Sequence, residues 1–275
     1  MKPVRLVAVA AFSLSLGALG IAHSMPQDPA SEQEASQAQA PEEEVATEET
    51  PDADVAAHKP GFLDLRRVAP ITGDAAAGKV KAETCHACHG ENGIAIAPNI
   101  PNLAGQNINY QYWELLQYHR GDRPDSPMSA MVPEGTTDQD LRDMSAYYAS
   151  LRPSGRNPVT DPDTPPPDPQ VLALGEKLYM EGDLAKGIPA CQGCHGADAR
   201  GHPLAAVKDR SGNLPYALYP ALRGQQQYFL LTRMIAFHEG GMFDSTSERL
   251  MVPISKRLDQ DSVMALSAWL SNLPH

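Results

Sequence analysis

The four cysteines of this 275-residue chain form two close pairs, and a histidine follows each pair directly. Both Cys85-His86-Ala87-Cys88-His89 and Cys191-Gln192-Gly193-Cys194-His195 read C-x-x-C-H. This spacing is the attachment signature of c-type haem, in which two thiols bond one porphyrin and the adjacent imidazole binds its iron. The sequence therefore predicts two covalently bound haem c groups, which use all four thiols.

Paired cysteines also serve in zinc sites, in redox-active dithiols and in structural disulfides. One C-x-x-C-H could arise by chance. Two copies, in duplicated halves of a chain with an export signal, favour haem over these alternatives. Haem attachment would leave no cysteine for thiolate ligation of iron.

Residues 1–24 have the pattern of a secretory signal peptide. Lys2 and Arg5 precede an apolar run over residues 6–22, which ends in the small-x-small sequence Ala22-His23-Ser24. The alternative is an uncleaved anchor, because 17 residues is the lower limit for a spanning helix. We expect a periplasmic protein, with membrane association through residues 1–24 if the segment is retained.

Residues 25–72 are expected to form an acidic, disordered linker. Ten acidic residues against Lys59 give residues 25–60 a net charge of −9, and there is little apolar content to offset the entropy of ordering. The whole chain carries −12, and Lys2 and Arg5 contribute +2 ahead of this segment, so residues 61–275 carry −5. A basic nucleic-acid-binding surface is therefore excluded, and no nucleic acid partner is expected.

A Pro-rich linker at residues 153–170 separates two expected domains, at 73–152 and 171–275. The two halves repeat each other at an offset of 119 residues without a gap. The matched positions are Gly105, Gln106, Tyr110, Leu115, Tyr118, His119 and Gly121 with Gly224, Gln225, Phe229, Met234, Phe237, His238 and Gly240.

The periodicity of the apolar residues predicts an all-α chain. Residues 141–151 and 263–273 each have one apolar face at helical spacing, and residues 75–82 and 171–180 also favour helix. Gly78 and Gly175, in the first helix of each half, are expected to contact the aromatic faces of Tyr147 and Trp269. The alternative is that each glycine marks a helix end.

The sixth iron ligand is expected to be a methionine, which raises the reduction potential. Met128 and Met251 are the first candidates, because both stand in expected loops rich in proline and just ahead of the last helix of each half. Met131 is the reserve for the first site, and Met242 is the reserve for the second.

Histidines at matched repeat positions are the other candidates for the sixth ligand. His119 and His238 both precede a glycine closely, which instead favours helix C-termini for them. His86 lies inside its own attachment sequence and is expected to face solvent.

Several further motifs resemble the dihaem cytochrome c4 family over residues 73–275. In the first half they are Gly73-Asp74-Ala75, the run Ala97-Pro98-Asn99-Ile100-Pro101-Asn102-Leu103-Ala104-Gly105-Gln106, and Met128-Ser129-Ala130-Met131. In the second half they are Gly187-Ile188-Pro189-Ala190, Tyr219-Pro220-Ala221-Leu222-Arg223-Gly224-Gln225, and Met251 with the helix that follows.

The resemblance implies two class I cytochrome c domains in tandem, with iron bound by His89 and Met128 in one and by His195 and Met251 in the other. It also implies that the carbonyl group of Pro101 bonds the first histidine ring, with Pro220 as its counterpart. The implied function is periplasmic electron transfer in a respiratory chain. Quinol–cytochrome c reductase or a dehydrogenase would be the donor, and a haem-copper terminal oxidase the acceptor.

The chain departs from the family pattern at the acidic extension, at one extra residue after Met128, and at a longer insert between His195 and Tyr219. Two other functions compete with a free carrier. One is the electron-transfer subunit of a periplasmic dehydrogenase complex. The other is a dihaem enzyme, such as a peroxidase or thiosulfate dehydrogenase, which the candidate methionines disfavour. No catalytic residue is assigned.

Overall fold

The computed structural model describes residues 64–123, 126–153, 166–240 and 245–274. This part of the chain is mainly helical and has no strands, so the all-α prediction is confirmed. Two isolated β-bridges join extended segments within it, Val68 with Leu214 and Asp183 with Ile188. The expected signal segment 1–24, the acidic segment as far as residue 63, and residues 154–165 of the linker lie outside the described residues.

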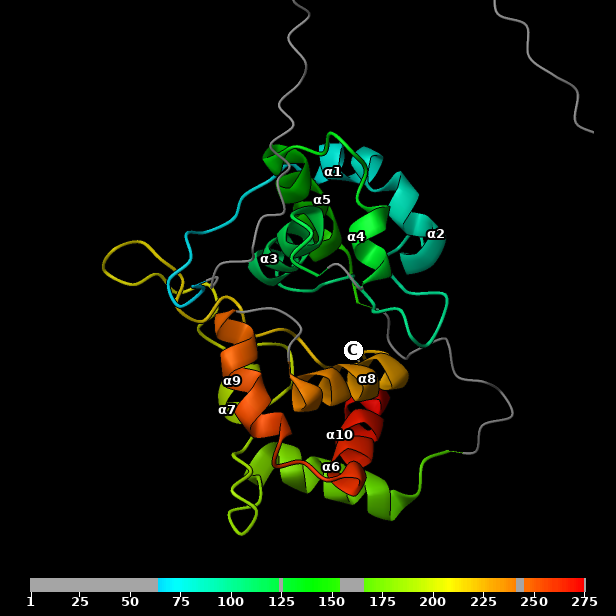
Figure 1. Cartoon of the computed structure of the whole chain (residues 1–275), viewed down its shortest axis with the longest axis vertical. Helices are drawn as coiled ribbons and strands as arrows, with labels where there is room; N and C mark the ends of the chain where they lie inside the picture. The colour runs from blue at the N-terminus through cyan, green and yellow to red at the C-terminus, as the bar shows by residue number, and fades with distance from the viewer. Residues whose placement is uncertain (1–63, 124–125, 154–165, 241–244, 275) are drawn as a thin grey trace, which may run out of the picture. The chain divides into compact units, whose positions relative to one another are not determined.

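The first module holds the helices that precede the Pro-rich linker (Figure 1). The last helix of this module, α5, begins with a capping box between Thr137 and Asp140, and both α1 and α3 pack against it. Leu141 and Met144 of α5 lie in the module's core. The helices are α1 Ala75–Lys81, the 3-10 turn Glu83–Cys85, α2 His86–His89, α3 Ile108–His119, α4 Pro127–Met131 and α5 Asp138–Ser150.

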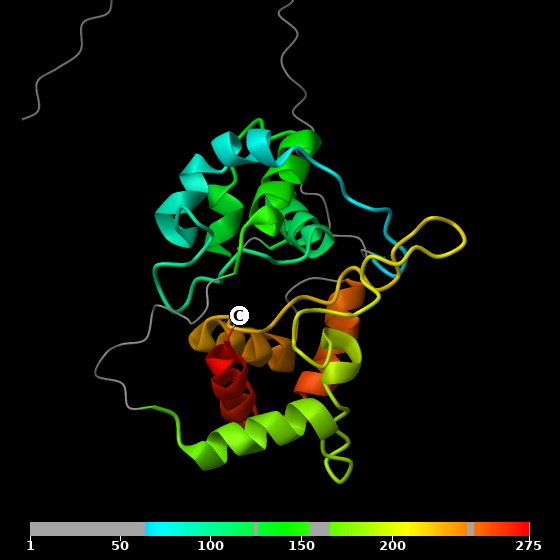
Figure 2. The same ribbon diagram turned by 180° about the vertical axis from the view of Figure 1, so that it is seen from behind.

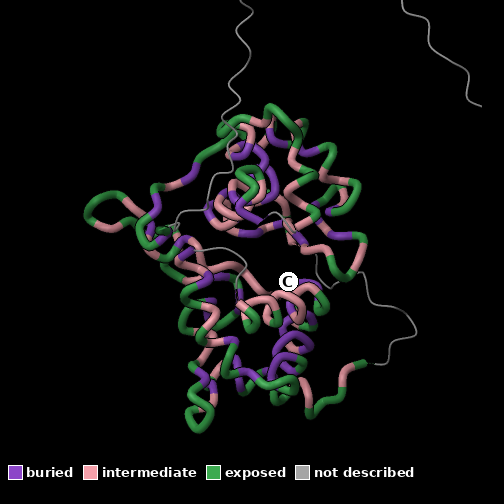
Figure 3. The backbone as a smooth tube through the Cα atoms, in the orientation of Figure 1, coloured by how far each residue is buried: buried purple, intermediate pink, exposed green. Residues whose placement is uncertain are grey.

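The second module has the corresponding arrangement, seen from behind in Figure 2. Its last helix, α10, packs against α6 and α8, and α8 packs against α9. Figure 3 shows that α5 and α10 are the most continuously buried helices of the two modules. The helices are α6 Pro169–Glu181, α7 Gln192–His195, α8 Gln227–Glu239, α9 Thr246–Ser255 and α10 Gln260–Asn272.

Two helix-interior glycines allow the first and last helices of each module to touch. A Cβ atom on Gly78 would lie 1.9 Å from the carbonyl oxygen of Asp143, and one on Gly175 would lie 2.2 Å from that of Ala265. Trp269 also approaches Gly175, but through its Cβ atom, which lies 2.6 Å from the added Cβ, and not through the predicted aromatic face. At Gly78 the nearest atoms belong to the backbone of Asp143 and Met144, so the expected contact with the ring of Tyr147 stays a prediction. Neither glycine marks a helix end.

Residues 64–72 do not follow the expectation of disorder. Leu65, Val68 and Ile71 are buried, so every third side chain of this stretch packs against the modules. The acidic residues that dominate the linker end at Asp54, apart from Asp64, and this final stretch has the apolar spacing that the upstream residues lack. The packed part of the chain therefore begins before residue 73.

Candidate functional site

Each C-x-x-C-H sequence forms a single helical turn. Cys85 and Cys191 stand at the start of α2 and α7, and each histidine is the last residue of its helix. No disulfide joins any of the four cysteines. Before haem attachment, burial raises the pKa of the Cys85 thiol and raises that of Cys191 to about 11.

A glycine ends both attachment turns, and sequence reasoning missed its role. Gly90 has φ +71° and Gly196 has φ +79°, a conformation that strains any residue with a side chain. A Cβ atom would lie 2.2 Å from the carbonyl oxygen of Ile94 in the first case and 2.3 Å from that of Gly201 in the second. The signal was present in the sequence, since a glycine directly follows both C-x-x-C-H copies.

The two histidines have the same hydrogen bond. Nδ1 of His89 lies 2.9 Å from the carbonyl oxygen of Pro101, and Nδ1 of His195 lies 3.1 Å from that of Pro220. A carbonyl oxygen can only accept, so Nδ1 carries the hydrogen and Nε2 keeps its lone pair for a metal. These are the contacts that the family resemblance implies.

Burial keeps both rings neutral. His89 and His195 are only 4% and 8% exposed, and burial lowers the pKa of each imidazole against the opposing effect of the proline carbonyl. Neutral imidazole is the form that binds metal ions. Two free thiols next to one buried, neutral, oriented imidazole fit the chemistry of haem c in each module.

The methionine candidates lie on helices, contrary to the expectation of loops. Met128 is in the five-residue helix α4, which Ser126 caps, and Met251 is in the ten-residue helix α9, which Ser245 caps. Pro253 lies inside α9, where it removes one backbone donor without ending the helix.

Exposure separates the candidates of the first module. The side chain of Met131 is 60% exposed, whereas Met128 is half-buried, as is Met251 in the second module. Met242, the reserve for the second site, lies outside the described residues.

The remaining histidines behave differently from one another. His119 ends α3 and His238 lies in the last turn of α8, so their predicted place at helix C-termini is confirmed. Both are exposed, and Nδ1 of His238 lies 2.9 Å from the carbonyl oxygen of Ser255. His86 does not simply face solvent, because its Nε2 atom is buried and its ring centroid lies 6.1 Å from that of Tyr147.

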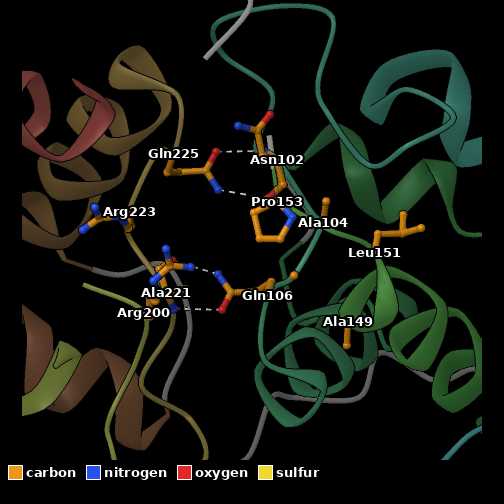
Figure 4. Close-up of a pocket in the computed structure, with 11 residues that line it drawn as sticks. Asn102, Ala104, Gln106, Ala149, Leu151, Pro153, Arg200, Ala221, Arg223 and Gln225 are labelled. Carbon is orange, nitrogen blue, oxygen red and sulfur yellow. Dashed lines mark hydrogen bonds between the residues drawn. The ribbon is translucent and has the colours of Figure 1, made fainter. Parts of the chain in front are cut away.

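Two glutamines at matched repeat positions join the modules (Figure 4). The side chain of Gln106 accepts from the backbone N–H of Ala221 and donates to its carbonyl oxygen, both at 2.9 Å. Gln225 makes the same pair of bonds to Asn102, at 2.7 and 3.0 Å. Asn102 and Ala221 are also 119 residues apart, so they occupy the same position in the two repeats. The glutamine of each module therefore bonds the same backbone position of the other module.

These glutamines border a cavity of about 320 Å³, and Figure 4 labels most of its lining residues. Arg200 and Arg223 line it from the second module, and Leu151 and Pro153 line it from the first. The guanidinium group of Arg223 donates to the carbonyl oxygen of Asp198 at 3.1 Å. The cavity thus lies between the two modules, beside the exchanged glutamine contacts.

A carboxylate on α3 pairs with arginines of both modules. One oxygen of Glu114 lies 2.7 Å from Arg123 and 3.2 Å from Arg233 of α8. Burial alone would raise the pKa of Glu114, but the two guanidinium groups lower it below its ordinary value. Glu114 and Arg233 occupy the same position in the two repeats.

The described residues lack two further kinds of site. None of their helices has both the length and the apolar character needed to cross a bilayer. No three of their His, Cys, Asp and Glu side chains gather as a metal-ion site.

Comparisons with known proteins agree with this geometry. The cytochrome c family pattern matches residues 75–152. Cytochrome c4 of Azotobacter vinelandii is 33% identical over 220 residues, which cover 77% of this chain and 94% of that protein. The thiosulfate dehydrogenase electron acceptor of Thiomonas intermedia is 31% identical, over 72% of this chain and 82% of its own length. The crystal structure of reduced cytochrome c4 from Pseudomonas stutzeri matches with a TM-score of 0.56 and 31% identity, over 74% of this chain and 100% of that one.

Proposed function

This chain belongs to the cytochrome c4 family, and from that premise we propose that it carries electrons in the periplasm to a haem-copper terminal oxidase. The chain is a dihaem electron-transfer cytochrome of two c-type domains and not an enzyme, and it has two covalently bound haem c groups. The proposal adds the location, the acceptor and a quinol–cytochrome c reductase or dehydrogenase as donor. It keeps the two domains that the sequence places at 73–152 and 171–275, and it adds residues 64–72, which pack on the modules, and the start of α6 at Pro169.

We assign the iron ligands as His89 with Met128 and His195 with Met251. The geometry of the two buried imidazoles supports the histidine ligands. In each ring Nδ1 bonds a proline carbonyl oxygen, and Nε2 is left to bind iron. The half-burial of Met128 supports it over the exposed Met131. Cys85 and Cys88 hold one porphyrin, and Cys191 and Cys194 hold the other.

Each haem, when bound, supplies the reversible one-electron change of its iron. The chain contributes orientation and electrostatics. The carbonyl groups of Pro101 and Pro220 fix the two ring planes and make the imidazoles more basic ligands. No side chain has to act as an acid, a base or a nucleophile in this function.

A second candidate donor follows from the similarity to the thiosulfate dehydrogenase electron acceptor. In that case a periplasmic dehydrogenase would reduce the chain directly. Stopped-flow reduction by purified thiosulfate dehydrogenase with thiosulfate, compared with reduction by quinol–cytochrome c reductase, distinguishes the two donors. The physiological donor should reduce the chain faster, and the rate should fall with ionic strength if docking uses charged patches.

The carrier proposal is tested by a redox titration with visible spectra, repeated under carbon monoxide. If methionine closes both irons, the reduced protein binds little carbon monoxide, has negligible peroxidase turnover and is oxidised rapidly by a terminal oxidase. Rapid stoichiometric binding of carbon monoxide by even one haem at neutral pH would favour an enzyme or a sensor instead.

A further inference from the structure

A short segment ahead of α1 contacts both modules. We call residues 64–72 the strap. At one end, the backbone N–H of Leu65 donates to Oγ1 of Thr246 at 2.9 Å, and Thr246 is the first residue of α9. At the other end, the N–H of Ile71 donates to Oδ1 of Asn109, on α3 of the first module, also at 2.9 Å.

The middle of the strap pairs with the long insert of the second module. Figures 1 and 2 both show the strap, in cyan, beside this insert, in yellow. The N–H of Leu214 donates to the carbonyl oxygen of Val68 at 2.8 Å, in an antiparallel bridge. Leu65 and Val68 are buried in one cluster with Leu214 and Ala217, and Trp113 of α3 packs against it.

The insert is itself braced next to the second histidine. The ring of His202 stacks on Tyr216 at 4.2 Å between centroids and with an interplanar angle of 13°, and it lies 5.6 Å from Tyr219. The ring of Tyr219 is 6.2 Å from that of His195. The next residue, Pro220, holds Nδ1 of His195. The strap therefore touches the segment that leads to the histidine side of the second site.

The contact between the strap and Thr246 connects it to the helix that carries Met251. Thr246 begins α9, five residues before Met251, and Ser245 caps the same helix. A strap that only extended the first module would bury its apolar side chains in that module's core. Ile71 alone does so, whereas Leu65 and Val68 join the cluster formed with the second module.

We propose that the strap is a clamp between the modules, which holds α9 and the insert of the second module against α3 of the first. Residues 64–72 thereby position the second haem site relative to the first for electron transfer between them. They are positioning residues, and none touches a ligand atom. The contacts above are sufficient for the clamp between the modules. Its effect on the second haem rests on the proposed function, in which Met251 of α9 binds the iron.

The test uses the full holoprotein. A Leu65→Ser/Val68→Ser double variant removes the apolar anchors, Val80→Ser removes a matched valine of α1 that is 67% exposed, and Val68→Ile is the conservative replacement. Hydrogen exchange of the Leu214 amide reports the bridge. The weak red absorption band of ferric iron–methionine bonding, followed through a denaturant titration, reports the second site.

The double variant should retain two haems and exchange the Leu214 amide at least tenfold faster than the parent. It should lose half of the methionine band at a lower denaturant concentration, whereas Val80→Ser and Val68→Ile should match the parent in both measurements. Unchanged exchange at Leu214 would overturn the clamp. Faster exchange with an unchanged denaturant midpoint would overturn its positioning role. A parent protein without any methionine band would instead refute the proposed ligand assignment, independently of the clamp.

Discussion

The two modules share one attachment geometry but reach it through loops of different length. Pro101 lies 12 positions after His89, whereas Pro220 lies 25 positions after His195, yet the two hydrogen bonds measure 2.9 and 3.1 Å. Among the extra residues of the second module, Leu214 and Ala217 pack against the strap, and His202 and Tyr216 stack beside Tyr219. Surface loops tolerate such additions because lengthening a loop adds little to its closure entropy. The histidine side of each site is thus constant, and the covering loops vary.

The methionine sides differ more. Met128 lies on a helix of five residues, whereas Met251 lies on one of ten that also meets the strap. Among the described residues, the second methionine therefore has more support from outside its own helix. The two repeats thus share the attachment turn more strictly than the helix that carries the methionine.

The largest effect is expected on the histidine side of each site, which is the same in the two modules. Gly90→Ala and Gly196→Ala should each destabilise their own module by about 3 kcal/mol or more, because the new Cβ atom overlaps a carbonyl oxygen at positive φ. Gly135→Ala is the control, since Gly135 has φ +77° but an open surrounding, and it should cost only about 1 kcal/mol. Thermal unfolding of the holoproteins measures all three. Equal losses at Gly90 and Gly135 would mean that conformation, and not the close contact, sets the requirement.

The next prediction concerns the methionine side of each site, which differs between the two modules. Met128→Ala and Met251→Ala should each lower the potential of one haem by on the order of 100 mV, within the ~0.8 V range that axial ligands span. Each should also halve the red ferric band, as measured by spectroelectrochemical titration. Met131→Ala should change neither quantity. If Met131→Ala has the effect instead of Met128→Ala, the assignment in the first module is wrong.

A smaller effect is expected where the modules meet. Gln106→Ala and Gln225→Ala each take the side-chain partner from two backbone N–H groups and one carbonyl group, at a cost of about 1–3 kcal/mol for each buried group left unpaired. Gln225→Ala should cost more, because its partner Asn102 is buried whereas Ala221 is half-buried. Denaturant unfolding compares the two variants. A larger loss from Gln106→Ala would contradict this ranking.

The smallest effect is expected upstream of both modules. Deleting residues 30–60 should leave both haem spectra and both potentials unchanged, because the strap begins at residue 64. Extending the deletion to residue 70 removes Leu65 and Val68 and serves as the contrasting variant. A spectral shift from the shorter deletion would mean that the acidic segment contributes to a site.

Local sequence patterns predicted the features that depend on neighbouring residues. The C-x-x-C-H turns, the helix C-termini at His119 and His238, and the all-α fold belong to this class, because each depends on spacing within a few residues. The helices that carry Met128 and Met251 were missed because proline was read as a helix breaker. In fact Pro127 occupies the favourable first turn of α4, and α9 tolerates Pro253.

Long-range contacts were beyond the sequence patterns. Nothing near Val68 indicates that Leu214 will pair with it, and the spacing of Leu65, Val68 and Ile71 is too short to distinguish a packed strap from a spacer. The sequence shows the two glutamines only as a repeated residue. That each one bonds the backbone of the other module follows from the structure. His86 was placed in solvent because its approach to Tyr147 depends on how α5 packs.

The pairing of Glu114 with Arg233 has a consequence for how two such modules can associate. In a symmetric homodimer of one module, the residue at this position would face its own copy, so two glutamates or two arginines would repel each other. Opposite charges here require two non-identical sequences, as in a tandem gene product whose halves have diverged. The ion pair thereby breaks the symmetry of the interface and disfavours self-association of either half. The dihaem unit therefore has two non-equivalent domains, and each domain pairs with the other and not with its own copy.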